Sequence, residues 1–85
     1  MWYVYILRSI KNPRKTYIGI TENLEKRLKE HNLNTQPHTS RYSPWIVETY
    51  IAFSDAKKAF YFEKYLKVGS GKAFLNKRLV GEPNI

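Results

Sequence analysis

Three ionisable side chains stand on helix faces that should be apolar. Arg27 and His31, four residues apart in "LEKRLKEHN", project beside the apolar stripe of the helix predicted over residues 24–31. Glu63, in "FYFEKYLK", falls on the inner face of a helix predicted to run to about Lys67. A charged group that faces the core is costly unless it is partnered, so these side chains could serve charge stabilisation or metal binding.

A structural role is an alternative for each of these groups. Arg27 and Glu63 could form an ordinary ion pair between the two helices. Arg27 could also extend its guanidinium to solvent along an apolar stem, and His31 could be a satisfied residue at the border of the core.

Two strand-like runs near the start of the chain each contain tyrosine. In "YVYIL", alternation places Tyr3, Tyr5 and Leu7 on one face, and "TYIGI" contributes Tyr17. Alone, these would be core aromatics whose hydroxyls are hydrogen-bonded. Gly19, inside the second run, predicts either a bulge or a close approach of another group to the backbone.

The elements that position these groups are predicted in the order β-β-α-β-α-α. They cover residues 2–8, 17–21, 24–31, 45–53, 54–67 and 70–79, with a loop over residues 32–44. Asn23 and Ser54 are expected to cap the first two helices, and Gly69 to end the second. This order predicts an α+β fold, a small three-stranded antiparallel sheet flanked by helices.

The composition predicts one small basic domain over residues 1–85, since this length supports a single core. The absence of cysteine excludes disulfides, thiolate metal sites and thiol nucleophiles. No apolar run approaches the ~20 residues of a membrane span, and the start lacks the basic region of a signal peptide. We therefore expect a complete cytoplasmic protein that does not enter a membrane.

Fifteen Lys and Arg against seven Asp and Glu give a net charge of +8, which favours a polyanionic partner such as nucleic acid, although it could also serve solubility. The candidate nucleic-acid-binding residues are Arg8, Lys11, Arg14, Lys15, Arg41, Lys72, Lys77 and Arg78.

Taken in order, these residues resemble the GIY-YIG nuclease superfamily, most closely its small single-domain bacterial branch and the nuclease module of the bacterial excision-repair endonuclease. The resemblance covers residues 2–79. Its elements are a first triplet Tyr3-Val4-Tyr5 that lacks the family's glycine, an intact Tyr17-Ile18-Gly19, the helix pair Arg27 and His31, the helix carboxylate Glu63, and the C-terminal Asn76.

The resemblance implies a metal-dependent endonuclease that hydrolyses phosphodiester bonds in DNA, in repair or recombination. Glu63 would hold one Mg²⁺ or Mn²⁺ together with water molecules. Arg27 would direct two donors at the non-bridging oxygens. Tyr5, Tyr17 and His31 would align the attacking water and move its proton, with Tyr17 favoured as base or relay and Gly19 and Asn76 in supporting positions.

Two other functions fit the same residues. The domain could bind nucleic acid and cut it weakly or not at all, or it could be a basic structural domain in which Arg27 and Glu63 merely pair. An inward glutamate, which repels phosphate, favours catalysis over binding alone. Targeting by a partner protein, dimerisation, and RNA instead of DNA all stay open.

Overall fold

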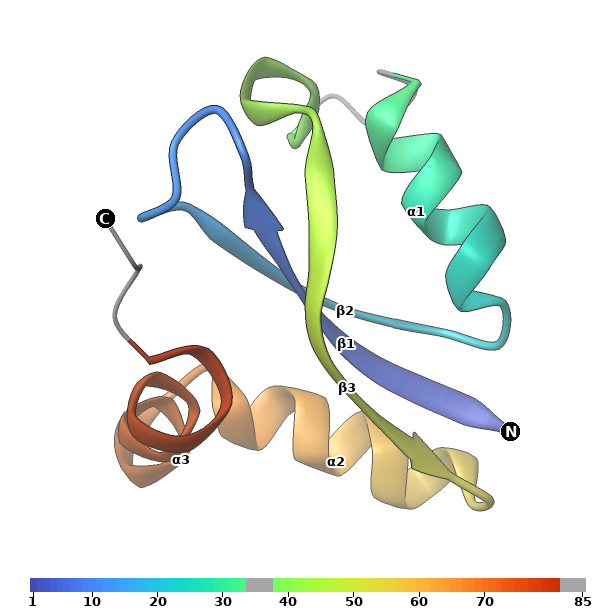
Figure 1. The fold of residues 1–85 in the computed structure, drawn as a ribbon. Coiled ribbons are helices and arrows are strands. Elements are labelled where there is room, and N and C mark those ends of the chain that lie inside the picture. Colours follow the sequence, from blue (N-terminus) through green and yellow to red (C-terminus); the bar gives the residue numbers. More distant parts are fainter. Residues whose placement is uncertain (34–37, 82–85) are drawn as a thin grey trace.

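Within residues 1–33 and 38–81, which the computed structural model describes, the chain forms a three-stranded antiparallel sheet with helices on both faces (Figure 1). The elements are β1 (Trp2–Ser9), β2 (Thr16–Thr21), α1 (Leu24–Asn32), the 3₁₀ turn η1 (Ser40–Tyr42), β3 (Trp45–Phe53), α2 (Ala56–Leu66), α3 (Gly69–Phe74) and the π-helical η2 (Leu75–Val80). The predicted element order and α+β class are confirmed.

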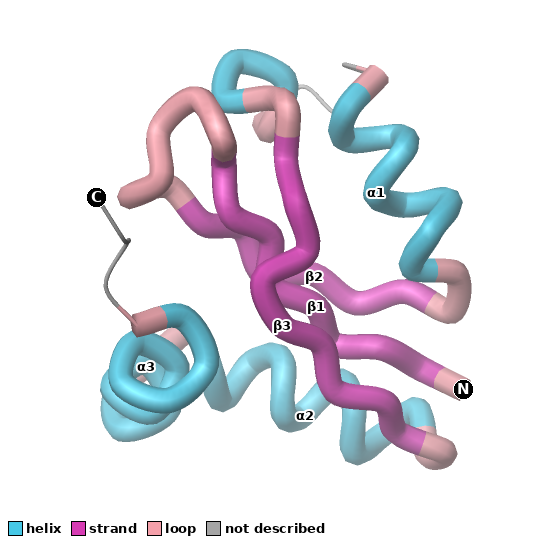
Figure 2. The backbone as a smooth tube through the Cα atoms, in the orientation of Figure 1, coloured by secondary structure: helices cyan, strands magenta, loops and turns pink. Residues whose placement is uncertain are grey.

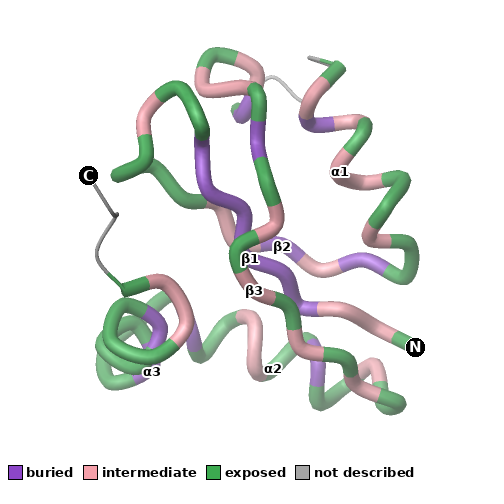
Figure 3. Tube along the Cα trace, viewed as in Figure 1, coloured by how far each residue is buried: buried purple, intermediate pink, exposed green. Residues whose placement is uncertain are grey.

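β1 is the central strand of the sheet, because both β2 and β3 pair with it. The strand order is β2-β1-β3, and Tyr5 lies opposite Gly19 in β2 and opposite Tyr50 in β3. The β1–β2 ladder is regular, whereas the β1–β3 ladder shifts register between Ile6 and Leu7. Figure 3 shows the middle of β1 as the buried centre of the sheet.

Strand alternation divides the apolar residues between two clusters, as the sequence predicts. On the α2 side of the sheet the buried residues are Val4, Ile6, Ala59, Leu66 and Leu75. On the α1 side they are Tyr5, Leu7 and Trp45, with Tyr17, Leu24, Leu28, Tyr42 and Val47 packed against them. The two faces of β1 are therefore chemically different, and its tyrosines belong to the α1 side.

The helix caps follow local hydrogen bonding. Asn23 caps α1, as predicted, because its side-chain oxygen accepts from the backbone N–H of Lys26. The prediction for the next helix was wrong by one residue. Asp55 and not Ser54 caps α2, since its carboxylate accepts from the backbone N–H of Lys57 at 2.8 Å.

The end of α2 also differs from the prediction. The helix ends at Leu66, and Gly69 opens α3 in place of closing α2. Gly69 has φ of 51°, a conformation that glycine adopts without strain, so it serves the sharp turn between the two helices. The predicted last helix is present as α3 and its continuation η2.

The predicted loop over residues 32–44 lies partly outside the described residues, at positions 34–37. In its described part, η1 packs beside the β1–β2 turn, where the Ile10 N–H donates to the Pro44 carbonyl at 2.9 Å (Figure 2). The Trp45 indole donates to the Thr39 carbonyl and holds the loop onto β3. Over the described ranges 1–33 and 38–81, we find no helix with the length and apolar character needed to span a bilayer.

Arg8 is an internal clamp, which corrects its assignment as a nucleic-acid contact. The residue is 9% exposed. Its Nε donates to Glu48 at 2.9 Å, Nη1 to the Pro13 carbonyl, and Nη2 to the Val80 carbonyl at 2.8 Å. The guanidinium thereby joins β1 to the hairpin turn, β3 and η2, and its donors are not turned toward a phosphate.

Replacing Arg8 by methionine should lower the free energy of unfolding by about 2–3 kcal/mol, because a partly buried carboxylate and two carbonyls are deprived of a charged donor. Urea unfolding measures this. The matched control is Arg14→Met, an exposed arginine of the same turn, which should change stability by less than about 0.5 kcal/mol. Equal destabilisation in both variants would contradict the clamp.

Candidate active site

The site begins with a close approach of Tyr5 to the backbone of β2. A Cβ atom built on Gly19 would lie 2.3 Å from the hydroxyl oxygen of Tyr5 and 2.4 Å from its Cζ. The Tyr5 ring therefore lies across the strand in space that only glycine leaves open. Of the two predicted reasons for this glycine, close approach is the correct one.

A chain of hydrogen bonds continues from Tyr5 into α1 and the following loop. The Tyr5 hydroxyl is bonded to Nε2 of His31 at 3.1 Å, and Nδ1 of His31 is bonded to the Thr39 hydroxyl at 2.8 Å. Tyr5 and His31 are each 1% exposed and Thr39 is 2% exposed. His31 is thus a buried residue with both ring nitrogens bonded, not a border residue.

Tyr17 brings a second phenol to the same place. Its ring centroid lies 5.0 Å from that of His31 and 6.4 Å from that of Tyr5. Tyr17 is only half-buried and lines a hollow of about 310 Å³ together with Lys67, Lys72 and others. The two phenols therefore differ: Tyr5 is sealed and Tyr17 faces open space.

The electrostatic environment keeps Tyr5 protonated. Burial raises the pKa of its phenol far above the ordinary value, and Tyr17 raises it further. Arg27 lowers this pKa, while Glu30 and Glu63 raise it. Charges from α1 and from α2, which lie on opposite sides of the sheet, thus act on the same phenol (Figure 1).

His31 is held neutral for related reasons. Burial lowers the pKa of its imidazole, and the nearby guanidinium of Arg27 lowers it further, whereas Glu30 raises it. Tyr5 and His31 therefore form an uncharged hydrogen-bonded pair at neutral pH.

The two charged groups that the sequence singles out do not pair with each other. Arg27 Nε lies 3.2 Å from Glu30 Oε1 on the same helix, and Glu63 Oε2 lies 2.6 Å from Lys67 Nζ. Across residues 1–33 and 38–81 there is no Arg27–Glu63 ion pair. The simple interhelical pair is thereby excluded, and each group pairs with a residue of its own helix.

Glu63 is the carboxylate that the sequence predicts to hold a metal ion. Its side chain is 14% exposed, and its partner Lys67 is 50% exposed, so the ammonium can turn to solvent and free the Oε2 oxygen. No cluster of three or more metal-ligating side chains occurs in the described parts of the chain. One carboxylate completed by water molecules is an arrangement that Mg²⁺ commonly takes, so the residues fit a single divalent ion of this kind.

The remaining basic candidates fall into two groups. At the hairpin end, Lys15 Nζ lies 5.3 Å and Arg41 Cζ 5.6 Å from the ring centroid of Tyr42. Lys11 Nζ donates to the Arg41 carbonyl at 3.4 Å. Arg14 is exposed in the same turn. On α3 and η2 the exposed candidates are Lys72, Asn76, Lys77 and Arg78, of which Lys72 and Asn76 line the hollow beside Tyr17.

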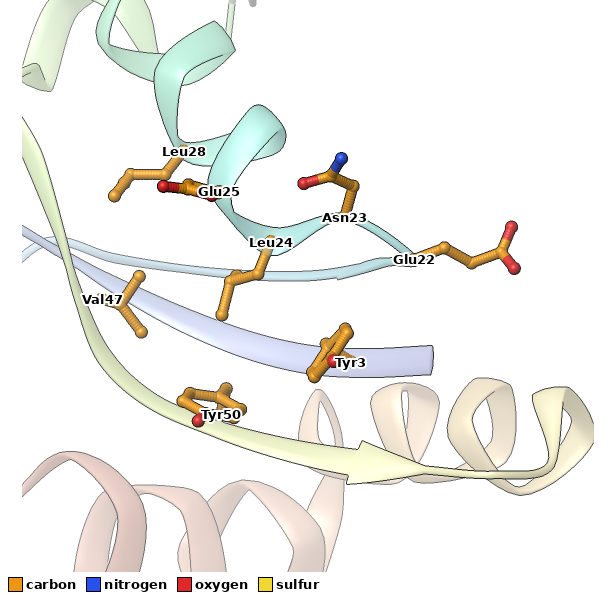
Figure 4. A pocket seen from close by; sticks show the side chains of 8 residues that line it. All are labelled: Tyr3, Glu22, Asn23, Leu24, Glu25, Leu28, Val47 and Tyr50. Atoms are coloured by element: carbon orange, nitrogen blue, oxygen red, sulfur yellow. The ribbon is translucent and has the colours of Figure 1, made fainter. Parts of the chain in front are cut away.

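Another hollow lies away from these groups. It measures about 500 Å³, lies between α1 and β3, and has an apolar wall that includes Leu24, Val47 and Tyr50 (Figure 4). A smaller one of about 260 Å³, lined by Arg27 and Glu30 among others, adjoins the far end of β2. Of the candidate catalytic residues, Tyr17 and Arg27 therefore line the two smaller hollows and not the apolar one.

The sequence did not point to Thr39 or Lys67. Lys67 follows Glu63 by four residues on a helix, a spacing that could have predicted the pair. Thr39 lies eight residues beyond His31, in a loop that returns to the helix by tertiary packing, and no local pattern marks it.

The fold and site define a small α+β domain with a tyrosine–histidine centre flanked by an arginine and a glutamate. The chain matches the model of the GIY-YIG catalytic domain over residues 1–78, and it belongs to the GIY-YIG family.

Two relatives carry the name of a structure-specific endonuclease subunit, SLX1. The Candida dubliniensis protein is 59% identical over 29 residues, which is 34% of this chain and 10% of the relative. The Giardia intestinalis homolog is 34% identical over 65 residues, which is 72% of this chain and 18% of the relative. The chain thus spans a minor part of the length of either.

Replacing Gly19 by alanine should push Tyr5 away from His31 and destabilise the fold by about 1–3 kcal/mol, the usual cost of overpacking a core. The control is the same change in a Tyr5→Leu background, which lacks the three contacting atoms Oη, Cζ and Cε1. A double-mutant cycle from urea unfolding should show that the cost largely disappears there. The same cost in both backgrounds would mean that Gly19 serves something other than Tyr5.

Proposed function

We propose that this domain is a divalent-metal-dependent endonuclease that hydrolyses phosphodiester bonds in DNA. The observation that carries the proposal is convergence on the Tyr5 phenol. Tyr5 of β1, Tyr17 of β2 and His31 of α1 contact one another, and the charges of Arg27 from α1 and Glu63 from α2 both act on that phenol. Membership of a family defined by a catalytic domain supports hydrolysis as the chemistry.

Arg27 is the group that receives the phosphate. Its side chain is 39% exposed and its present partner is Glu30, an exposed-side pair of the kind that contributes little to stability. The guanidinium can leave Glu30 and give two parallel hydrogen bonds to the non-bridging oxygens, where charge accumulates in the transition state.

Glu63 is the residue that holds Mg²⁺ or Mn²⁺. A bound divalent ion would supply charge neutralisation at the phosphoryl and leaving oxygens. Lys67 balances the carboxylate in the free protein and would turn to solvent, where its ammonium can meet the substrate backbone.

Tyr17 is the phenol that meets the attacking water, because its side chain lines the open hollow while Tyr5 is sealed. The buried Tyr5–His31 pair stands behind it as a fixed, neutral hydrogen-bonded partner. The two phenols lie in different environments, since Tyr5 is buried and Tyr17 lines an open hollow. Such a difference commonly separates the roles of two groups in an acid–base site.

The substrate should extend from the site toward the hairpin end of β2. The hollow at that end is lined by Lys67 and Lys72 with no carboxylate among its described lining residues, whereas at the other end Lys26 and Arg27 lie beside Glu22 and Glu30. Lys15 and Arg41 continue the basic surface around Tyr42. Phosphates beyond the one that Arg27 receives are therefore attracted more strongly to the first end, because the two cations at the second end are offset by two carboxylates.

The names of the relatives extend the proposal to a substrate class and a partner. Both are described as subunits of structure-specific endonucleases. We propose by analogy that this domain acts on branched or otherwise structured DNA in repair or recombination, and that a partner protein or a second copy directs it there.

A second candidate function is a nucleic-acid-binding module without cutting. The ion pair between Glu63 and Lys67 favours it, since the lysine offsets the charge of the carboxylate and so weakens its repulsion of phosphate.

Nicking of supercoiled plasmid with Mg²⁺ separates the two functions. Wild-type protein should nick the DNA, a chelator should stop it, and Glu63→Gln should lower the rate by about 100-fold or more, as removal of a transition-state charge partner typically does. Glu25→Gln, which removes an exposed carboxylate of α1, is the matched control and should keep full activity. Wild-type protein that shifts DNA in a gel and leaves it uncut would favour the binding module.

The basic surface around Tyr42 makes a separate prediction about affinity. The double variant Lys15→Met, Arg41→Met should bind DNA more weakly and reduce the slope of log affinity against log salt by about 1 for each phosphate that the protein no longer neutralises. Fluorescence anisotropy over a range of salt measures this. The control pair Lys57→Met, Lys58→Met removes two exposed charges from α2 and should leave the slope unchanged. Equal slopes in both double variants would place the DNA elsewhere.

A further inference from the structure

His31 is hydrogen-bonded at both ring nitrogens, to Tyr5 on one side and to Thr39 on the other. Nδ1 of His31 lies 2.8 Å from the Thr39 hydroxyl, and Nε2 lies 3.1 Å from the Tyr5 hydroxyl. All three residues are at most 2% exposed, so bulk water does not compete for these bonds. The imidazole is therefore fixed at both nitrogens, and the partner on one side limits what the other nitrogen can do.

The chemistry of the two contacts indicates the tautomer. A phenol is a good donor, and an unprotonated imidazole nitrogen is a good acceptor, so the favourable arrangement has the Tyr5 O–H donating to Nε2. The ring then carries its proton on Nδ1 and donates it to the Thr39 oxygen. The raised pKa of the Tyr5 phenol and the lowered pKa of the His31 imidazole keep both groups in the forms that this arrangement needs.

We infer that Thr39 is a positioning residue that holds His31 as the Nδ1–H tautomer, so that Nε2 accepts a hydrogen bond from the Tyr5 hydroxyl and the Tyr5 oxygen keeps its lone pairs toward the site. Without the Thr39 oxygen, the proton can move to Nε2. Tyr5 must then accept from His31, and its own O–H turns away from the imidazole. This inference rests on the proposed endonuclease function for its effect on rate, but not for its effect on the tautomer.

The Thr39 side chain can be tested separately from the Thr39 backbone, because the two make different hydrogen bonds. The Thr39 carbonyl accepts from the Trp45 indole at 2.9 Å and from the backbone N–H of Tyr42 at 3.2 Å. These bonds anchor the loop without the hydroxyl. A Thr39→Val change therefore removes the contact to His31 and leaves the anchors in place.

Among the residues that the structure describes, Thr39 is the hydrogen-bond partner of Nδ1. Tyr5 occupies Nε2. Arg27 and Glu30 act on His31 through their charges, and Tyr17 contacts the imidazole through its own ring.

The test compares Thr39→Val, Thr39→Ser and Thr49→Val. Thr49 is a matched control because its hydroxyl also makes a strong bond, a donation to the Leu79 carbonyl at 2.6 Å, away from His31. Long-range proton–nitrogen NMR reports which imidazole nitrogen is protonated. His38, the other histidine, is exposed, so its signals are distinguishable from those of buried His31.

We expect Nδ1–H in the wild type, Thr39→Ser and Thr49→Val, and a shift to Nε2–H in Thr39→Val. The kcat for nicking should fall about 10- to 100-fold in Thr39→Val with KM nearly unchanged, and Thr39→Ser should restore it. A wild type with Nε2–H, or a Thr39→Val protein with an unchanged tautomer, would overturn the inference whatever happens to kcat. If the wild type cuts no DNA, the proposed function fails and the NMR comparison still decides the role of Thr39.

Discussion

The contact on which the site depends is the passage of the Tyr5 ring over Gly19. Tyr5 lies in the central strand, where both faces are covered, and its hydroxyl can reach His31 only because the neighbouring strand has no side chain at that point. A glycine in a strand normally weakens it. Here that weakening is offset by a buried aromatic ring and by a hydrogen bond that ties the sheet to α1.

Burial then decides the chemical character of the groups around Tyr5. Removing a phenol and an imidazole from water favours their neutral forms, so the innermost pair acts by hydrogen bonding and not by charge. The charged groups Arg27 and Glu63 remain partly exposed at the margin. This layering, neutral inside and charged outside, allows a small domain to place several polar groups together without burying an unpaired ion.

The basic residues of the chain occupy two different environments, the interior of the fold and the surface. Arg8 uses its guanidinium inside the fold, where it gathers carbonyl oxygens from segments far apart in the sequence. Lys15 and Arg41 lie beside an aromatic ring at the surface, and Lys72 lines the hollow next to Tyr17. A count of basic residues cannot separate these roles, because the same side chain satisfies a carbonyl in the core or a phosphate in solvent.

The sequence by itself determined the element order, the two faces of β1, the Asn23 cap and the ordered motifs of the GIY-YIG family, since these depend on residue spacing and on contacts within a few positions. It also limited the reason for Gly19 to a bulge or a close approach, and the structure decided for the close approach. Only the tertiary structure decided that Asp55 and not Ser54 caps α2. The same holds for the burial of Arg8 and for the hydrogen bond between Thr39 and His31. Ser54 and Asp55 are adjacent and either side chain could cap the helix, so residue type alone does not select between them. The other two depend on partners brought close by folding, and such partners leave no periodic signal in the chain.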